Sequence, residues 1–189
     1  MKINKVWSMP NKKTFNIKPI RELICRYLPD KDSMKFDKDF KRIDKEQVWI
    51  DPFAGESNIA HIRNDLEITM ETQYHQEALA FLKSLESNKY DGCLFDPPYS
   101  LRQLVECYKK NNLSVNMQTT QSSYWSKIKK EIARIIKPGG YCISFGWNSN
   151  GIGKHLQFQQ IEILLVAHGG RHNDTICVVE RKLVNGVLL

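Results

Sequence analysis

The chain has 189 residues, of which 41% are hydrophobic, 10% aromatic and 26% charged, as is ordinary for a soluble globular domain. No apolar segment approaches the ~20 residues that span a bilayer, and the N-terminal segment lacks the continuous apolar stretch of a secretory signal. We therefore expect a single domain over residues 1–189, cytoplasmic and without a membrane partner.

The net charge of +7 is concentrated near the N-terminus, where residues 1–46 hold 13 Lys/Arg against 7 Asp/Glu. This excess indicates either a solvated basic surface or a surface that meets phosphate groups. The five cysteines are far apart, and no two have C-x-x-C spacing. We expect reduced thiols, with neither a disulfide framework nor a metal site.

The first half of the chain alternates strand-like and helix-like segments. Residues 18–28 read as a helix with Pro19 in its first turn, where a missing N–H costs nothing. Residues 48–55 form an apolar run closed by Pro52 and Gly55, and residues 61–66 read as a second short strand. Residues 77–87 have the apolar spacing of a helix.

The second half continues the alternation. Residues 90–95 read as a strand, and residues 101–125 as a polar surface loop. An amphipathic helix covers 122–135 and is expected to stop at Lys137-Pro138-Gly139-Gly140. A buried strand follows at 141–147. Residues 161–170 and 174–183 are expected to form an antiparallel hairpin.

Strands that alternate with helices predict an α/β fold, with a mainly parallel sheet and helices on both faces. The closing hairpin adds an antiparallel edge. Ligands bind such sheets beyond the carboxyl ends of the strands. Two strands end there unusually, in Asp51-Pro52-Phe53-Ala54-Gly55 and in Asp96-Pro97-Pro98-Tyr99. Both should lie on one rim.

These two motifs, preceded by the segment Thr14–Ile24, resemble the S-adenosylmethionine-dependent methyltransferases that act on amino groups. The DNA adenine methyltransferases are the most similar branch, here in a small form without a separate target-recognition domain. The resemblance implies a class I, Rossmann-like methyltransferase fold and S-adenosylmethionine as cofactor. It covers about residues 7–182.

The resemblance assigns catalysis to Asp96, Pro97, Pro98 and Tyr99. The Asp96 carboxylate and the Pro97 carbonyl would accept the two hydrogens of an exocyclic amine, held rigidly by tandem prolines. The Tyr99 ring would stack on a base flipped out of a duplex. The alternative is that this stretch is only a proline-rich strand stop.

The resemblance places the cofactor on a larger set. Its members are Phe15, Lys18, Pro19, Asp51, Pro52, Phe53, Ala54, Gly55, Asp65, Glu77 and Asp96. Plain structural readings stay open: a strand turn at 51–55, a solvated Asp65, a helix N-terminal acid at Glu77 and a surface lysine at Lys18. The family's second glycine is replaced by Ser57, and the segment up to Asp65 is too short for the usual helix.

Residues that meet nucleic acid are less visible. Candidates that combine charge and aromatic rings are Arg102, Tyr124, Trp125, Arg171 and His172. Solvated loops and ordinary turn chemistry at 169–174 would explain them as well.

The leading hypothesis is a site-specific DNA methyltransferase that methylates adenine, as in restriction–modification systems, acting as a homodimer or with a partner subunit. A second hypothesis is methylation of adenine in RNA or of the cytosine amine in DNA. A third is a non-catalytic, methyltransferase-like nucleic-acid-binding subunit. No metal is expected.

Overall fold

The computed structural model describes residues 1–28, 47–111 and 122–187. Along the chain, these residues form the following elements: β1 (Lys2–Trp7), η1 (Thr14–Asn16), α1 (Lys18–Tyr27), β2 (Trp49–Asp51), β3 (Ile62–Arg63), α2 (Ala78–Ser84), β4 (Tyr90–Phe95), α3 (Leu101–Lys110), α5 (Ser122–Ile135), β5 (Ile136–Gly146), η2 (Lys154–Leu156), β6 (Phe158–Ala167) and β7 (Thr175–Lys182). No helix among them is long and apolar enough to cross a membrane.

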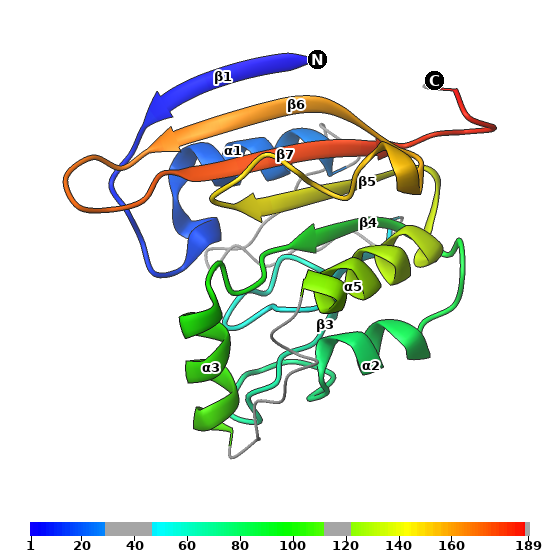
Figure 1. The fold of residues 1–189 in the computed structure, drawn as a ribbon, viewed down its shortest axis with the longest axis horizontal. Helices are drawn as coiled ribbons and strands as arrows, with labels where there is room; N and C mark the ends of the chain where they lie inside the picture. Colours follow the sequence, from blue (N-terminus) through cyan, green and yellow to red (C-terminus); the bar gives the residue numbers. More distant parts are fainter. Residues whose placement is uncertain (29–46, 112–121, 188–189) are drawn as a thin grey trace.

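The strands form one seven-stranded sheet in the order β1-β6-β7-β5-β4-β2-β3 (Figure 1). All neighbouring pairs are parallel except the two that involve β7. The expected mainly parallel sheet with a closing antiparallel β6–β7 pair is therefore confirmed. Because β1 to β6 point the same way, their carboxyl ends share one edge of the sheet. The two motif turns, which follow β2 and β4, lie side by side on it.

Helices cover both faces of the sheet, as expected (Figure 1). Adjacent strand residues point to opposite faces, so Trp49, Leu94 and Ile143 pack with α1. Their neighbours Ile50, Cys93 and Cys142 pack with α2 and α5. Each layer therefore excludes water from one side of the central strands.

Gly92 lets the central strands pack closely. A Cβ at this position would lie 2.4 Å from the Trp49 ring, far inside van der Waals contact. The fully buried Trp49 indole lies over the β4 backbone in that space. The pairing of β2 with β4, which brings the two motif turns together, depends on this glycine.

Three sequence expectations differ from the structure. The hairpin does not form the edge of the sheet, because β7 inserts between β6 and β5 while the unexpected strand β1 pairs outside β6. Residues 101–110 are the helix α3 and not a loop, whereas 112–121 lie outside the described residues. The expected stop of α5 before Lys137 is confirmed, but β5 begins at Ile136 and not at 141, with Gly139 at φ +83°.

Helix α3 has a local sequence signal that the prediction of a loop overlooked. Ser100 caps the helix by accepting a hydrogen bond from the Gln103 N–H, 3.2 Å away. Ser-x-x-Gln is the spacing of a capping box, and the buried Leu104 and Tyr108 are one helical turn apart. The short link from Gly55 to β3, in contrast, contains no helix, as its length predicts.

Candidate active site

Asp96 directly follows β4 at the centre of the rim and is half-buried. The Tyr99 hydroxyl donates a hydrogen bond to its Oδ1 atom. Burial raises the pKa of Asp96 to about 6, while hydrogen bonds from the Tyr99 and Thr14 hydroxyls act to lower it. The carboxyl group is therefore poised to change its charge near neutral pH, as groups at active sites often are.

The Tyr99 ring is held by contacts beyond Asp96. Its backbone N–H donates to the Gln103 side-chain oxygen over 2.7 Å, which fixes the start of α3 against the motif. The Trp147 ring, which follows β5, meets it edge-on at a centroid distance of 5.6 Å. Trp147 is 42% exposed. The rings of Tyr99 and Trp147, which follow different strands, are therefore in contact at the rim, and one of them is partly open to solvent.

The turn after β2 is organised by the fully buried Asp51. Its Oδ1 atom accepts from the Phe53 N–H at 3.0 Å, whereas Oδ2 has no partner among the described residues. Burial raises the pKa of Asp51 well above its ordinary value. Gly55 then adopts φ +52°, a conformation that favours glycine, and a Cβ there would meet nothing within 4 Å. The turn thus leaves open space above its backbone.

Asn64 joins the ends of β2 and β3 to the segment before α2, and the sequence analysis missed it. Its buried amide donates to the carbonyls of Pro52, at 3.1 Å, and Gln76, at 3.0 Å, and it accepts from the Gln76 N–H at 3.0 Å. An isolated parallel bridge between Asn64 and Tyr74 extends the sheet beyond β3. These bonds hold the segment that leads into Glu77.

Two of the acidic residues expected near a cofactor, Asp65 and Glu77, accept hydrogen bonds within the protein. Asp65 accepts from the N–H groups of Gly55 and Glu67, each at 2.8 Å. Glu77 caps α2 by accepting from the N–H groups of Leu79 and Ala80. The Tyr124 hydroxyl donates to its other oxygen.

Two cavities open at this rim. The first, of about 780 Å³, lies under α3 and extends from Asp65 and Glu77 past Asp96 to the β6–β7 turn. The second, of about 940 Å³, lies between the segment 12–16 and the Phe53–Ile59 turn. Four residues line both and mark their junction: Lys12, Thr14, Phe53 and Asp96.

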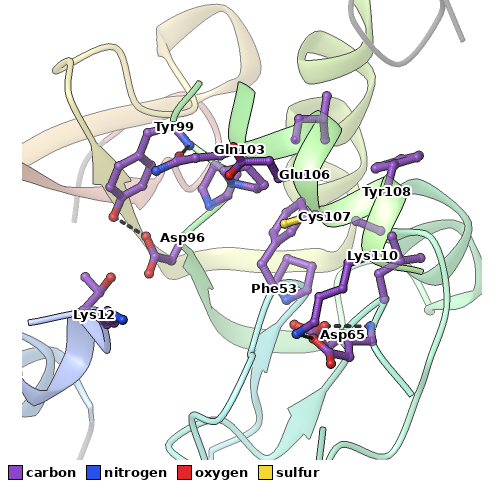
Figure 2. A pocket seen from close by; sticks show the side chains of 18 of the residues that line it. Lys12, Phe53, Asp65, Asp96, Tyr99, Gln103, Glu106, Cys107, Tyr108 and Lys110 are labelled. Carbon is purple, nitrogen blue, oxygen red and sulfur yellow. Dashed lines mark hydrogen bonds and ion pairs between the residues drawn. The ribbon is translucent and has the colours of Figure 1, made fainter. Parts of the chain in front are cut away.

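Figure 2 shows how side chains from distant segments converge on the first cavity. Asp96 and Tyr99 face each other in hydrogen-bond contact, while Asp65 lies on the far side of Phe53. Lys110, at the end of α3, reaches toward that side and forms an ion pair with Glu67 at 2.6 Å. Helix α3 is thereby tied across the cavity from Tyr99 to Glu67.

Most of the expected site residues line one of the cavities. The lining includes Phe15, Pro52, Phe53, Ala54, Gly55, Asp65, Glu77, Asp96, Pro97, Pro98, Tyr99, Tyr124, Arg171 and His172. Five others line neither. Asp51 is enclosed by its own turn, Lys18 and Pro19 lie in the first turn of α1, and Arg102 and Trp125 lie on α3 and α5. The Lys18 side chain is 78% exposed, so a direct cofactor contact is not supported by its position.

The expected nucleic-acid residues are divided. Arg102 is exposed on α3 outside the cavities and pairs with Glu106 at 2.8 Å. Tyr124 is buried with its hydroxyl on Glu77, and Trp125 packs 6.2 Å from the Phe53 ring. Tyr124 is buried and Trp125 is half-buried, so neither ring stands free in solvent, and a contact of either with nucleic acid stays a prediction.

Other residues of the first cavity came from no sequence signal that we used. They include Asn11, Lys12, Gln103, Glu106, Cys107, Trp147 and His168. The His168 ring bonds the Ser8 carbonyl and the Thr175 hydroxyl, each at 2.9 Å, and so joins three segments. Within the described residues, no cluster of three or more His, Cys, Asp or Glu side chains is placed to hold a metal ion.

Comparisons with known proteins identify the fold. No protein-family model matches the sequence, and no curated protein does. Among solved structures, an S-adenosylmethionine-dependent methyltransferase from Archaeoglobus fulgidus matches with a TM-score of 0.51 and 11% identity, over 86% of this chain and 94% of that one. The Escherichia coli protein yhhF matches with a TM-score of 0.50 and 9% identity, over 93% and 90%. The chain has the class I methyltransferase fold.

Proposed function

We propose that this protein transfers a methyl group from S-adenosylmethionine to the exocyclic amine of adenine in DNA. The observation that carries the proposal is the position of Asp96-Pro97-Pro98-Tyr99. This motif lies on the rim where a parallel sheet binds ligands, and Asp96 lines both cavities. A donor that spans the second cavity and one end of the first, and an acceptor at the other end of the first, would meet at Asp96.

The residues around the second cavity fit the methionine part of the donor. Phe15 and Phe53 offer apolar surface, and the open space above Gly55 permits close approach to its backbone. The nucleoside part fits the Asp65 and Glu77 end of the first cavity, where carboxylate oxygens can accept from hydroxyl and amino groups. Asp51 would act indirectly, by holding the turn.

When bound, S-adenosylmethionine supplies an electrophilic methyl group. Asp96 and the Pro97 carbonyl accept the two amine hydrogens and orient the nitrogen lone pair toward that methyl carbon. Formation of the new nitrogen–carbon bond would break the sulfur–carbon bond of the donor and release one amine proton. The Asp96 carboxylate, with a pKa of about 6, can receive that proton and pass it to water.

The target base fits the other end of the first cavity, between Tyr99 and the β6–β7 turn. The Tyr99 and Trp147 rings offer a surface that offsets part of the stacking lost when a base is flipped out. Arg171 and His172 stand at the same end, where they would meet the backbone of the strand. The net charge of +7 favours such a polyanion. Adenine in RNA and the cytosine amine in DNA remain alternatives that the same geometry would accept.

A non-catalytic nucleic-acid-binding subunit is the second candidate, and one observation favours it. The carboxylates that would bind the donor, Asp65 and Glu77, already accept hydrogen bonds from the protein, and Tyr99 occupies Asp96. A protein that no longer binds S-adenosylmethionine could keep such internal hydrogen bonds. Calorimetric titration with S-adenosylmethionine separates the candidates, because the subunit would show no binding at millimolar donor.

The test of the proposed function is a methyl-transfer assay on adenine-containing DNA, with digestion to nucleosides and mass spectrometry. We expect methyladenine with the unmodified protein and none with Asp96→Ala. Parallel reactions on RNA, and detection of methylcytosine, identify the alternative substrates. Donor binding without any methylated nucleoside would refute the proposal.

A further inference from the structure

The end of β1 exposes large apolar side chains beside the candidate active site. Trp7 is 65% exposed and Met9 is 67% exposed. The strand is parallel to β6, so Trp7 lies at the same sheet edge as the end of β4. An indole is costly to leave in water, and an exposed ring at a ligand-binding rim can serve as a stacking surface.

This segment is fixed rigidly to the β6–β7 turn. The Ser8 N–H donates to the Ala167 carbonyl at 3.0 Å, and the buried His168 ring bonds the Ser8 carbonyl. The Trp7 Nε1 atom lies only 3.4 Å from where a Cβ on Gly169 would be. The ring therefore rests on the glycine backbone, and the rest of it faces solvent.

The same two segments lead directly into the first cavity. Pro10, Asn11 and Lys12 follow Trp7 and line it, and Arg171 and His172 follow Gly169 and line it from the facing turn. Lys12 and Arg171 are exposed, and neither forms an ion pair with any other described residue. The exposed Trp7 ring is thus followed, toward the mouth of the first cavity, by the two unpaired cations Lys12 and Arg171.

The charge of the surface around Trp7 indicates which kind of partner binds there. Residues 1–13 contain Lys2, Lys5, Lys12 and Lys13 and no acidic residue. Of these four, Lys2 pairs with Glu162 and Lys13 pairs with Glu56. A second copy of the chain docking here through the same face would bring like charges together, which is unfavourable. A polyanion with flat apolar groups has the complementary chemistry, because lysine and arginine meet its phosphates while an indole stacks on its bases.

We propose that Trp7, Lys12 and Arg171 form a binding track for the nucleic-acid strand that carries the target base. An unpaired base flanking the target stacks on Trp7, and the intervening backbone phosphates meet Lys12 and Arg171. Because a stacked flanking base must be out of a duplex, the preferred substrate is a single-stranded or locally opened strand. This inference rests on the proposed function and specifies its substrate class.

The test measures affinity for a fluorescein-labelled DNA strand of about 12 nucleotides by fluorescence anisotropy. We expect tighter binding to the single strand than to the same sequence in a blunt duplex. Trp7→Ala should weaken single-strand binding about 5- to 100-fold, whereas Trp7→Phe, which keeps a ring, should retain most of it. Lys12→Gln should reduce the slope of log affinity against log salt by about 0.7.

Two controls separate this inference from the proposed function. Ile3, 66% exposed on the same face of β1, lies four residues farther from the rim, and Ile3→Ala should leave strand binding unchanged. Calorimetric binding of S-adenosylmethionine should be unchanged by Trp7→Ala, which also reports intact folding.

Equal strand affinity of Trp7→Ala and the unmodified protein would overturn the track and leave the proposed function standing. Absence of DNA binding by the unmodified protein would overturn both. A homodimer in sedimentation that both Trp7→Ala and Ile3→Ala dissociate would make this face an interface between copies, and would also overturn the track.

Discussion

Replacing Asp96 by asparagine tests the physical argument for the candidate active site. Asparagine keeps an acceptor oxygen for the target amine and for the Tyr99 hydroxyl. It removes the titration of the carboxyl group. We therefore expect Asp96→Asn to keep measurable methyl transfer while it changes the pH dependence of both rate and stability.

The expected change in stability follows from the raised pKa of Asp96. Burial shifts it from 3.8 to about 6, so the native protein holds this proton more tightly than the unfolded chain does. The stability that this proton contributes is fully present below pH 3.8 and is lost as the pH rises through 6. Ionised Asp96 then costs up to about 3 kcal/mol relative to a neutral side chain, less what partial exposure to water recovers.

Chemical denaturation at several pH values measures this difference. Asp96→Asn should be more stable than the unmodified protein by roughly 1–3 kcal/mol at pH 8. The advantage should shrink as the pH falls through 6 and nearly vanish near pH 4. In the methyl-transfer assay, the unmodified protein should lose activity below pH 6, and the variant should not show this loss.

An advantage that stays constant between pH 4 and pH 8 would refute the reasoning, because it would mean that Asp96 does not titrate with a raised pKa. A variant less stable at pH 8 would refute it as well. Asp96→Ala serves as the control for catalysis, since it removes both the charge and the acceptor.

Three further predictions follow from the same contacts. Tyr99→Phe keeps the stacking ring but removes the hydroxyl whose hydrogen bond lowers the pKa of Asp96, so the pH midpoint of activity should rise above 6. Tyr99→Ala should abolish activity. A pH–rate profile of Tyr99→Phe with an unmoved midpoint would contradict this. Asn64→Ala should cost about 3 kcal/mol in urea unfolding and raise KM for the donor, since buried backbone groups lose partners; Gln73→Ala, which removes two exposed hydrogen bonds nearby, should cost less. Gly92→Ala should cost about 3 kcal/mol or more, because its Cβ would overlap the Trp49 ring, and a thermal midpoint within a few degrees of the original would contradict the packing argument.

Much of the fold followed from local patterns in the chain. Alternating apolar strands and amphipathic helices predicted the parallel sheet with two covered faces, and the turn at 169–174 predicted the antiparallel β6–β7 pair. Helix α3 was missed although its capping residues were readable. Strand β1 was missed because an edge strand buries little, and its side chains are mostly exposed.

The candidate site divides in the same way. The motif turns could be recognised because strand ends, prolines and a positive-φ glycine are local features. The cavity lining from Lys12, Trp147 and His168 could not, since each comes from a different element. The burial of Tyr124 and Trp125 also depends on long-range packing against Glu77 and Phe53.

The sequence by itself determined which residues end β2 and β4, because that choice rests on backbone chemistry within a few positions. Only the tertiary structure decided that the two cavities meet at Asp96, and that Trp7 lies against Gly169 in the turn that leads into the first cavity. Those relations come from the order of strands in the sheet. That order depends on which side chains pack together across more than a hundred residues of chain, and no short segment carries that information.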